Sequence, residues 1–132
     1  MYIFRIQDSN NNGCLLPKEK FKYRFPYDLD YQDYPRKNTH PDADTGTALQ
    51  KAMYDKTITL ESKYLFGCAS IRDLYSWFSP VDIGYYELNG FYVHVYDVPR
   101  EYIIFGSNQV AFDSDHVISK RKLSHKELRR WH

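Results

Sequence analysis

The stretch "FYVHVYDV", residues 91–98, decides the fold because its side chains are apolar or aromatic on both faces of a strand. A strand with one face in solvent alternates apolar and polar residues, whereas a strand with two large faces is buried between layers. Asn89-Gly90 before it forms a turn, and Pro99 after it cannot donate to a sheet ladder. We therefore expect this stretch to be the central strand of a sheet.

Four further stretches are rich in β-branched and aromatic residues and are predicted as strands. In the first, "YIFRI" (residues 2–6), alternation places Arg5 on the face opposite to Tyr2, Phe4 and Ile6. The others are "KYLFGCA" (63–69), "YIIF" (102–105) and "QVAF" (109–112). A Gly-Ser-Asn turn separates the last two and favours a hairpin.

Serine-initiated capping patterns mark where helices begin. The clearest is Ser70 with Asp73, because the apolar residues that follow recur at helical spacing. Ser79 begins a second pattern, with proline at the first helical position. Ser124 begins a third, which predicts a basic C-terminal helix over residues 124–132.

These elements predict a small α+β domain. We expect about five strands in a compact mixed or antiparallel sheet, either continuous or split, with three or four helices. A chain of 132 residues can bury one core but is too short for two ordinary ones. We therefore expect a single domain over residues 1–132.

A long segment at residues 23–46, "YRFPYDLDYQDYPRKNTHPDADTG", holds four tyrosines, three prolines and five aspartates. The prolines exclude a continuous helix or a central strand, and the aromatic content is unlike that of a disordered tail. The sequence predicts an ordered, exposed loop that acts as a recognition surface. Tyrosine and arginine dominate interface energies, so the candidate partner-binding residues are Arg24, Tyr27, Tyr31, Tyr34 and Arg36.

The same loop places His40, Asp42 and Asp44 at alternate positions, which could ligate a divalent ion in an extended chain. A turn at Pro41 followed by an aspartate cap for a helix over residues 45–56 explains them better. No metal site is predicted.

The net charge of +1 is unevenly distributed along the chain. Residues 116–132 carry six basic residues and one acidic residue, so the other 115 residues sum to −4. A solvent-exposed face of the terminal helix is one interpretation, and contact with nucleic-acid phosphates is the other. Under the second, the candidate nucleic-acid-binding residues are Lys120, Arg121, Lys122, Arg129 and Arg130.

The amino-acid sequence also indicates the cellular compartment of the protein. No apolar run approaches the ~18 residues of a membrane span, and the start "MYIFRIQD" has no secretory pattern. Cys14 and Cys68 show no metal or redox spacing, which favours free thiols in a reducing compartment. We expect a cytoplasmic protein without a membrane partner.

The central strand places Tyr92, His94 and Tyr96 on one face, an arrangement that some proteins use to stack bases. The strand itself carries no Arg or Lys, and both of its faces are large. Core packing is therefore the favoured interpretation of these rings. The nucleophile and phosphate-loop patterns GxSxG, GxxxxGK[ST] and GxGxxG are absent.

Arg5 on the first strand, Ser70 in "FGCAS" and Gln109 in "GSNQVAFD" follow an order that resembles ADP-ribosyltransferases of the arginine–serine–glutamate type. The resemblance implies NAD as the cofactor, with Arg5 on its phosphates, Ser70 near the nicotinamide ribose, and position 109 on a ribose hydroxyl. It covers short stretches around the three residues. The same strand–helix–strand order also resembles small uncharacterised proteins of bacteriophages.

Position 109 departs from that family, because glutamine stands where the family has glutamate. Gln109 can accept a hydrogen bond from the ribose. It cannot supply the negative charge that stabilises the cationic sugar as nicotinamide leaves. The resemblance therefore indicates a fold more than an activity.

The sequence supports three functions. The leading one is a small protein-binding or inhibitor module without a cofactor, encoded by a phage and acting in the host cytoplasm by occupying a host protein, as anti-CRISPR and other anti-defence proteins do. The alternative is an NAD-dependent ADP-ribosyltransferase-like enzyme that uses Arg5, Ser70 and Gln109, which is less favoured because its glutamate is missing. A further alternative is nucleic-acid binding through the basic tail.

Overall fold

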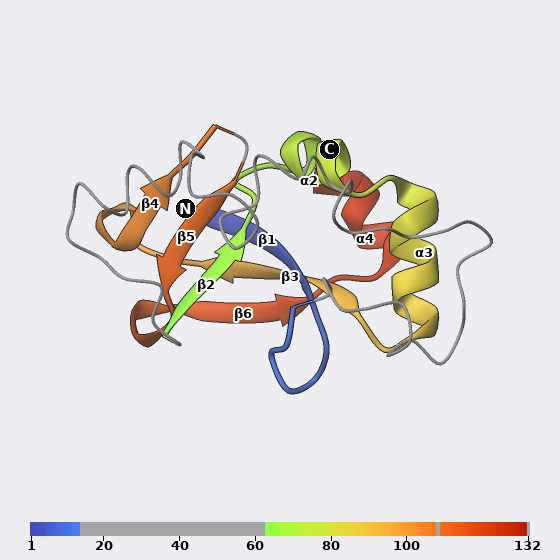
Figure 1. Cartoon of the computed structure of the whole chain (residues 1–132), viewed down its shortest axis with the longest axis horizontal. Coiled ribbons are helices and arrows are strands. Elements are labelled where there is room, and N and C mark those ends of the chain that lie inside the picture. The colour runs from blue at the N-terminus through green and yellow to red at the C-terminus, as the bar shows by residue number, and fades with distance from the viewer. Residues whose placement is uncertain (14–62, 108, 132) are drawn as a thin grey trace.

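The computed structural model describes residues 1–13, 63–107 and 109–131, which form an α+β arrangement (Figure 1). The strands are β1 (Tyr2–Gln7), β2 (Tyr64–Gly67), β3 (Tyr92–Asp97), β4 (Ile103–Phe105), β5 (Val110–Asp113) and β6 (Ser119–Lys122). The helices are α2 (Ile71–Trp77), α3 (Pro80–Leu88) and α4 (His125–Leu128), and 3-10 turns cover Arg100–Tyr102, Ser114–His116 and Arg129–Trp131. The predicted α+β class is confirmed.

The strands form two antiparallel three-stranded sheets. Sheet 1 has the order β1-β3-β6, so the stretch around β3 is the central strand, as predicted. Sheet 2 has the order β2-β5-β4. Of the two predicted arrangements, the split one is therefore observed.

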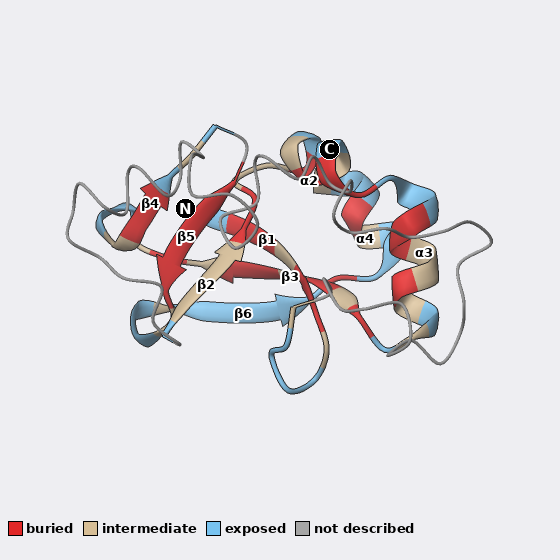
Figure 2. Cartoon of the chain, viewed as in Figure 1, coloured by how far each residue is buried: buried red, intermediate tan, exposed pale blue. Residues whose placement is uncertain are grey.

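Strand β6 was not predicted, because its sequence SKRK has neither β-branched nor aromatic residues. These residues belong to the basic stretch near the C-terminus, for which no strand was predicted, and the structure shows that they form one. They pair with β3 at the edge of sheet 1, where β3 would otherwise lack a neighbour on that side. All four residues are exposed, and Figure 2 shows the contrast between exposed β6 and largely buried β3.

The two sheets are joined where β2 ends against β1. Phe4 and Cys68 exchange two backbone hydrogen bonds of 2.8 Å each. Gly67 permits this approach, because a Cβ at that position would lie 2.7 Å from both the Ile3 Cγ2 atom and the Phe4 carbonyl oxygen. These distances are too short for van der Waals contact, so the crossing requires a residue without a side chain.

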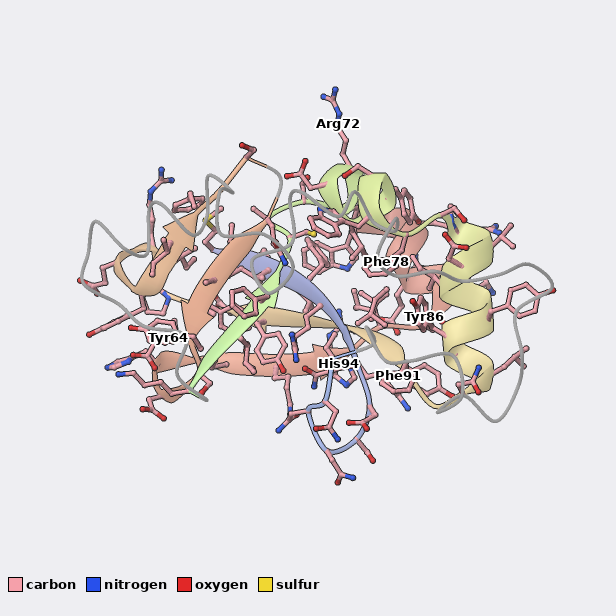
Figure 3. The ribbon with its side chains drawn as sticks, in the orientation of Figure 1. Tyr64, Arg72, Phe78, Tyr86, Phe91 and His94 are labelled. Atoms are coloured by element: carbon pink, nitrogen blue, oxygen red, sulfur yellow. The ribbon has the colours of Figure 1, made fainter. Side chains whose placement is uncertain are left out.

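One face of sheet 1 packs against the helices. Phe4 and Ile6 of β1 and Val93 and Val95 of β3 point to this side, as the alternation predicts for β1. The helices contribute Ile71, Leu74, Trp77, Ile83, Tyr86 and Leu128. Phe78, Tyr86 and Phe91 gather beside α3 with edge-on ring contacts of 5.5 and 6.3 Å (Figure 3).

The helices begin at the predicted serine caps. Ser70 Oγ accepts a hydrogen bond of 3.0 Å from the backbone N–H of Asp73. Ser79 and Asp82 cap each other reciprocally at the start of α3. Ser124 Oγ accepts from the backbone of the residue three positions on, at the start of α4. Each cap satisfies a backbone donor that the first helical turn leaves unpaired.

The other face of sheet 1 is only half covered by sheet 2. Ile3, Tyr96 and Val98 pack against residues of sheet 2, and the rings of Tyr96 and Phe112 lie 4.9 Å apart. The core residues from sheet 2 are Ile103, Val110 and Phe112. Beyond Tyr96, towards the start of β3, this face of sheet 1 carries polar side chains instead.

Candidate functional site: a basic face on sheet 1

The half of this sheet 1 face that sheet 2 does not cover gathers side chains from three strands. Across the ladder, Arg5 lies opposite His94, and His94 lies opposite Lys122. Side chains at paired and alternate positions share one face of a sheet. The register therefore assembles a set that we call the basic face: Arg5, Gln7, Tyr92, His94, Lys120 and Lys122.

The basic face places positive charge above a partly aromatic floor. Lys120 and Lys122 are exposed and Arg5 is partly exposed, while Tyr92 and His94 are half-buried between them. The strand positions on this face carry no acidic residue. Clustered cations over a low-dielectric surface produce a positive potential that attracts anions.

Gln7 organises the polar contacts of the basic face. This side chain is 1% exposed. Its Oε1 accepts a hydrogen bond of 3.1 Å from Arg5 Nε and another from the Tyr96 hydroxyl. Its Nε2 donates to Asn11 Oδ1 at 3.0 Å, and the same oxygen accepts from Lys120 Nζ at 3.0 Å. One buried amide thus connects two of the cations through short, directional bonds.

Asn11 reaches the basic face because the loop after β1 folds back on itself. The Asp8 carboxylate accepts from the backbone N–H groups of Asn10 and Asn12 at 2.9 and 2.8 Å. Asn11, between them, adopts φ of 65°, a conformation that asparagine tolerates better than most residues. Its carbonyl oxygen accepts a 3.1 Å hydrogen bond from Arg5 Nη2. The loop therefore holds the Arg5 guanidinium in place.

His94 and Tyr92 form the floor of the basic face. His94, labelled on β3 in Figure 3, has its Nδ1 3.0 Å from the Tyr92 carbonyl oxygen. Lys122 Nζ lies 4.4 Å from the centre of the Tyr92 ring, within cation–π range. Burial lowers the pKa of His94, and the nearby charges of Lys120, Lys122 and Arg5 lower it further, against the raising effect of the Tyr92 carbonyl. His94 is therefore neutral at neutral pH.

The three residues of the enzyme interpretation occupy different environments. Arg5 belongs to the basic face, and Ser70 is the N-cap of α2. Gln109 is buried immediately before β5, and its Oε1 has no hydrogen-bond partner within the described residues. No hydrogen bond within the described residues joins any two of the three.

In the structure, the residues of the predicted basic tail lie in different places. Lys120 and Lys122 lie on the basic face, whereas Arg121 points to the other side of β6 and pairs with Glu127. Arg129 and Arg130 are exposed in the 3-10 turn after α4.

Sequence reasoning missed that Tyr92 and His94 adjoin cations, because the cations come from neighbouring strands. The alternation of the two lysines at positions 120 and 122 is the signal that would have placed them on one strand face.

Several sequence predictions lie outside the described residues. They concern the loop 23–46 with its partner-binding candidates Arg24, Tyr27, Tyr31, Tyr34 and Arg36, and the histidine and aspartates near its end. Within the described residues, no three His, Cys, Asp or Glu side chains are grouped closely enough to ligate a metal ion. The helices in this part of the chain are too short or too polar to cross a bilayer.

Comparison with known proteins gives one match. The model of the family described as "Bacteriophage T4 Y00F protein" matches residues 1–126, which include every strand of the basic face. No curated protein and no solved structure matches the chain. The predicted resemblance to bacteriophage proteins is therefore confirmed, while the resemblance to ADP-ribosyltransferases gains no support. The chain belongs to the bacteriophage T4 Y00F protein family.

Proposed function

We propose that this phage protein is a binding module that holds single-stranded nucleic acid on the basic face. The observation that carries the proposal is the row Arg5–His94–Lys122, which crosses all three strands of sheet 1. The row combines two cations with a half-buried ring and contains no carboxylate. It sits on the half of the sheet face that sheet 2 leaves uncovered.

The charges suit a phosphate backbone. Lys120 and Lys122 are two residues apart on one edge strand, a separation of about 6.6 Å. Both residues are exposed, and the hydrogen bond from Lys120 Nζ to Asn11 Oδ1 is also exposed, so a phosphate can replace it. Neutralising phosphates releases condensed counterions, which is the main source of affinity for nucleic acid.

The aromatic floor favours unpaired bases over a duplex. Tyr92 and His94 are half-buried on the sheet face, and Lys122 Nζ lies 4.4 Å from the centre of the Tyr92 ring, so a base that stacks on this ring would take the place of the ammonium group. The bases of a single strand can turn towards a flat sheet and stack on such rings, with about 1–3 kcal/mol per base. A sheet face with both rings and cations is thus matched to a flexible strand.

Lysines on an edge strand also have a structural role, because they discourage pairing with a second chain. That role explains Lys120 and Lys122 by themselves. It does not explain why Gln7 and Asn11 hold Arg5 and Lys120 on the same face through hydrogen bonds that converge on the buried Gln7 amide. Ordering cations at a cost in conformational freedom is expected where they meet a ligand.

A charge-reversal experiment tests the proposal. We expect Lys120→Glu with Lys122→Glu to weaken binding to fluorescein-labelled oligothymidine more than about tenfold and to reduce the salt slope by about 1.4, the value for two lost phosphate contacts. The matched control is Lys126→Glu with Arg130→Glu, which changes the net charge equally but lies on α4 and the following turn. We expect the control to weaken binding by less than about threefold. Fluorescence anisotropy across a range of salt concentrations measures both.

Three results would contradict the proposal. Equal losses in the two double variants would assign binding to the tail as a whole. Absence of salt-sensitive binding by the unmodified protein would remove the function. Competition by polyglutamate as strong per charge as that by oligothymidine would point to an acidic protein surface instead.

The two other functions remain predictions. Occupation of a host protein by an anti-defence module rests on Arg24, Tyr27, Tyr31, Tyr34 and Arg36, and replacing three of these tyrosines with alanine tests it by loss of partner binding in a folded variant. Transfer of ADP-ribose from NAD would require Arg5 to exchange the carbonyl oxygens of Phe66 and Asn11 for phosphates. Labelled NAD with cell lysate tests that activity.

A further inference from the structure

His94 occupies the centre of the basic face, and its two ring nitrogens have different environments. Nδ1 lies 3.0 Å from the Tyr92 carbonyl oxygen, which can only accept a hydrogen bond. Nδ1 therefore carries the hydrogen in the neutral ring. Nε2 has no hydrogen-bond partner among the described residues. The neutral side chain thus presents a lone pair at Nε2, between the strands that carry Arg5 and Lys122.

A lone pair at this position is mismatched to a phosphate oxygen, since both are acceptors. Protonation at Nε2 converts the ring to an imidazolium, in which both nitrogens donate. The Tyr92 carbonyl continues to accept from Nδ1 in either state, so the ring need not turn. A single proton therefore changes the central side chain of the basic face from a group that repels phosphate to one that binds it.

We propose that His94 is a proton-dependent phosphate contact: its imidazole takes up one proton as single-stranded nucleic acid binds, and Nε2 then donates a hydrogen bond to a phosphate oxygen. This inference rests on the proposed function of the basic face.

The groups around His94 determine whether its pKa rises or falls when nucleic acid binds. Among the residues that the structure describes, the charged groups that face it are Arg5 from β1 and Lys120 and Lys122 from β6, all positive. The neighbouring titratable rings are Tyr92 and Tyr96, and burial raises the pKa of Tyr96, so its phenol stays protonated near neutral pH. In the free protein, burial and the three cations lower the pKa of His94. A bound phosphate offsets those cations and raises it.

This difference in the pKa of His94 determines how the affinity for nucleic acid changes with pH. The bound state holds more protons than the free state between the two pKa values of His94, so affinity rises as the pH falls through that interval. Because a single proton is coupled to binding, the affinity can change by at most about tenfold per pH unit. Above the interval both states are neutral, and the affinity no longer depends on this residue.

The experiment measures anisotropy of labelled oligothymidine at constant ionic strength, at pH values of about 7.5 and about 5.5. We expect the unmodified protein to bind more than about fivefold tighter at the lower pH, within the single-proton ceiling. His94→Gln should change by less than about twofold. The matched control is His116→Gln, an exposed histidine next to Asp113 on the turn after β5, and it should keep the full pH dependence.

A second readout does not depend on a variant folding. NMR titration of the His94 ring in the unmodified protein should show its pKa rising when oligothymidine is added. Salt-sensitive binding without pH dependence, an unchanged His94 pKa, or full pH dependence in His94→Gln would overturn the inference and leave the proposed function standing. Absence of salt-sensitive binding at both pH values would remove the two together.

Discussion

Gly67→Ala is expected to destabilise the protein by roughly 2–4 kcal/mol. The added Cβ would lie 2.7 Å from Ile3 Cγ2 and 2.7 Å from the Phe4 carbonyl oxygen. The Ile3 side chain is fully buried, and the Phe4 carbonyl accepts a 2.8 Å hydrogen bond from Cys68. Relief of the clash therefore requires the two sheets to separate at their junction, which costs both packing and backbone hydrogen bonds.

Gly84→Ala is the matched control, because the same methyl group is added where there is room. The nearest atom to a Cβ at position 84 is His125 Nε2, at an ordinary contact distance of 3.7 Å. Gly84 lies inside α3, where alanine is favoured over glycine by about 0.5–1 kcal/mol. Urea unfolding followed by circular dichroism measures both variants. Equal stability of Gly67→Ala and the unmodified protein would refute the role of Gly67 at the sheet junction.

The sequence predicted the elements whose own residues specify them. The central strand around β3 was recognised because Val93 and Val95 are apolar on one face and Tyr96 is aromatic on the other, and each face meets a layer of the core. The helices were recognised because Ser70 and Ser79 supply local caps. Interactions that span three or four residues leave a trace in the sequence, so these predictions could be made.

Strand β6 could not be predicted in the same way, because no residue within Ser119–Lys122 is β-branched or aromatic. Its pairing is provided by β3, about 25 residues earlier in the chain, in the antiparallel register that places His94 opposite Lys122. The basic face could not be predicted for the same reason. Arg5 was selected from its resemblance to a catalytic arginine, yet its neighbours on the face come from β3 and β6. Long-range pairing therefore determines both the missed strand and the missed site.

The same face of sheet 1 has an apolar part, which sheet 2 covers, and a polar part, which sheet 2 leaves uncovered. Sheet 2 covers the part of the face that holds Ile3, Tyr96 and Val98, and its contact ends where the side chains become polar. Burial of Tyr96 places its hydroxyl beside Gln7, which in turn contacts Arg5. The apolar core and the basic face are thus continuous through one buried amide, and a change at that amide should affect stability and binding together.

Gln7→Leu is therefore expected to lower the free energy of unfolding by roughly 2–4 kcal/mol. Leucine has a similar size but leaves Arg5 Nε and the Tyr96 hydroxyl without their shared acceptor, and Asn11 Oδ1 without one of its donors. Loss of these bonds also frees Arg5 and the Asn11 loop, so the affinity for oligothymidine should fall in the fraction that remains folded. Urea unfolding and anisotropy at low denaturant measure the two effects.

Tyr96→Phe provides the control and separates the network from the core, because it deletes one hydroxyl and keeps the ring 4.9 Å from Phe112. Its expected cost is about 1 kcal/mol. In the Gln7→Leu background the Tyr96 hydroxyl is buried without an acceptor, so removing it there should cost nothing or stabilise the protein. The double variant should then be more stable than the sum of the single losses by about 1 kcal/mol or more. Strict additivity would mean that Gln7 and Tyr96 act independently and that no shared network supports the basic face.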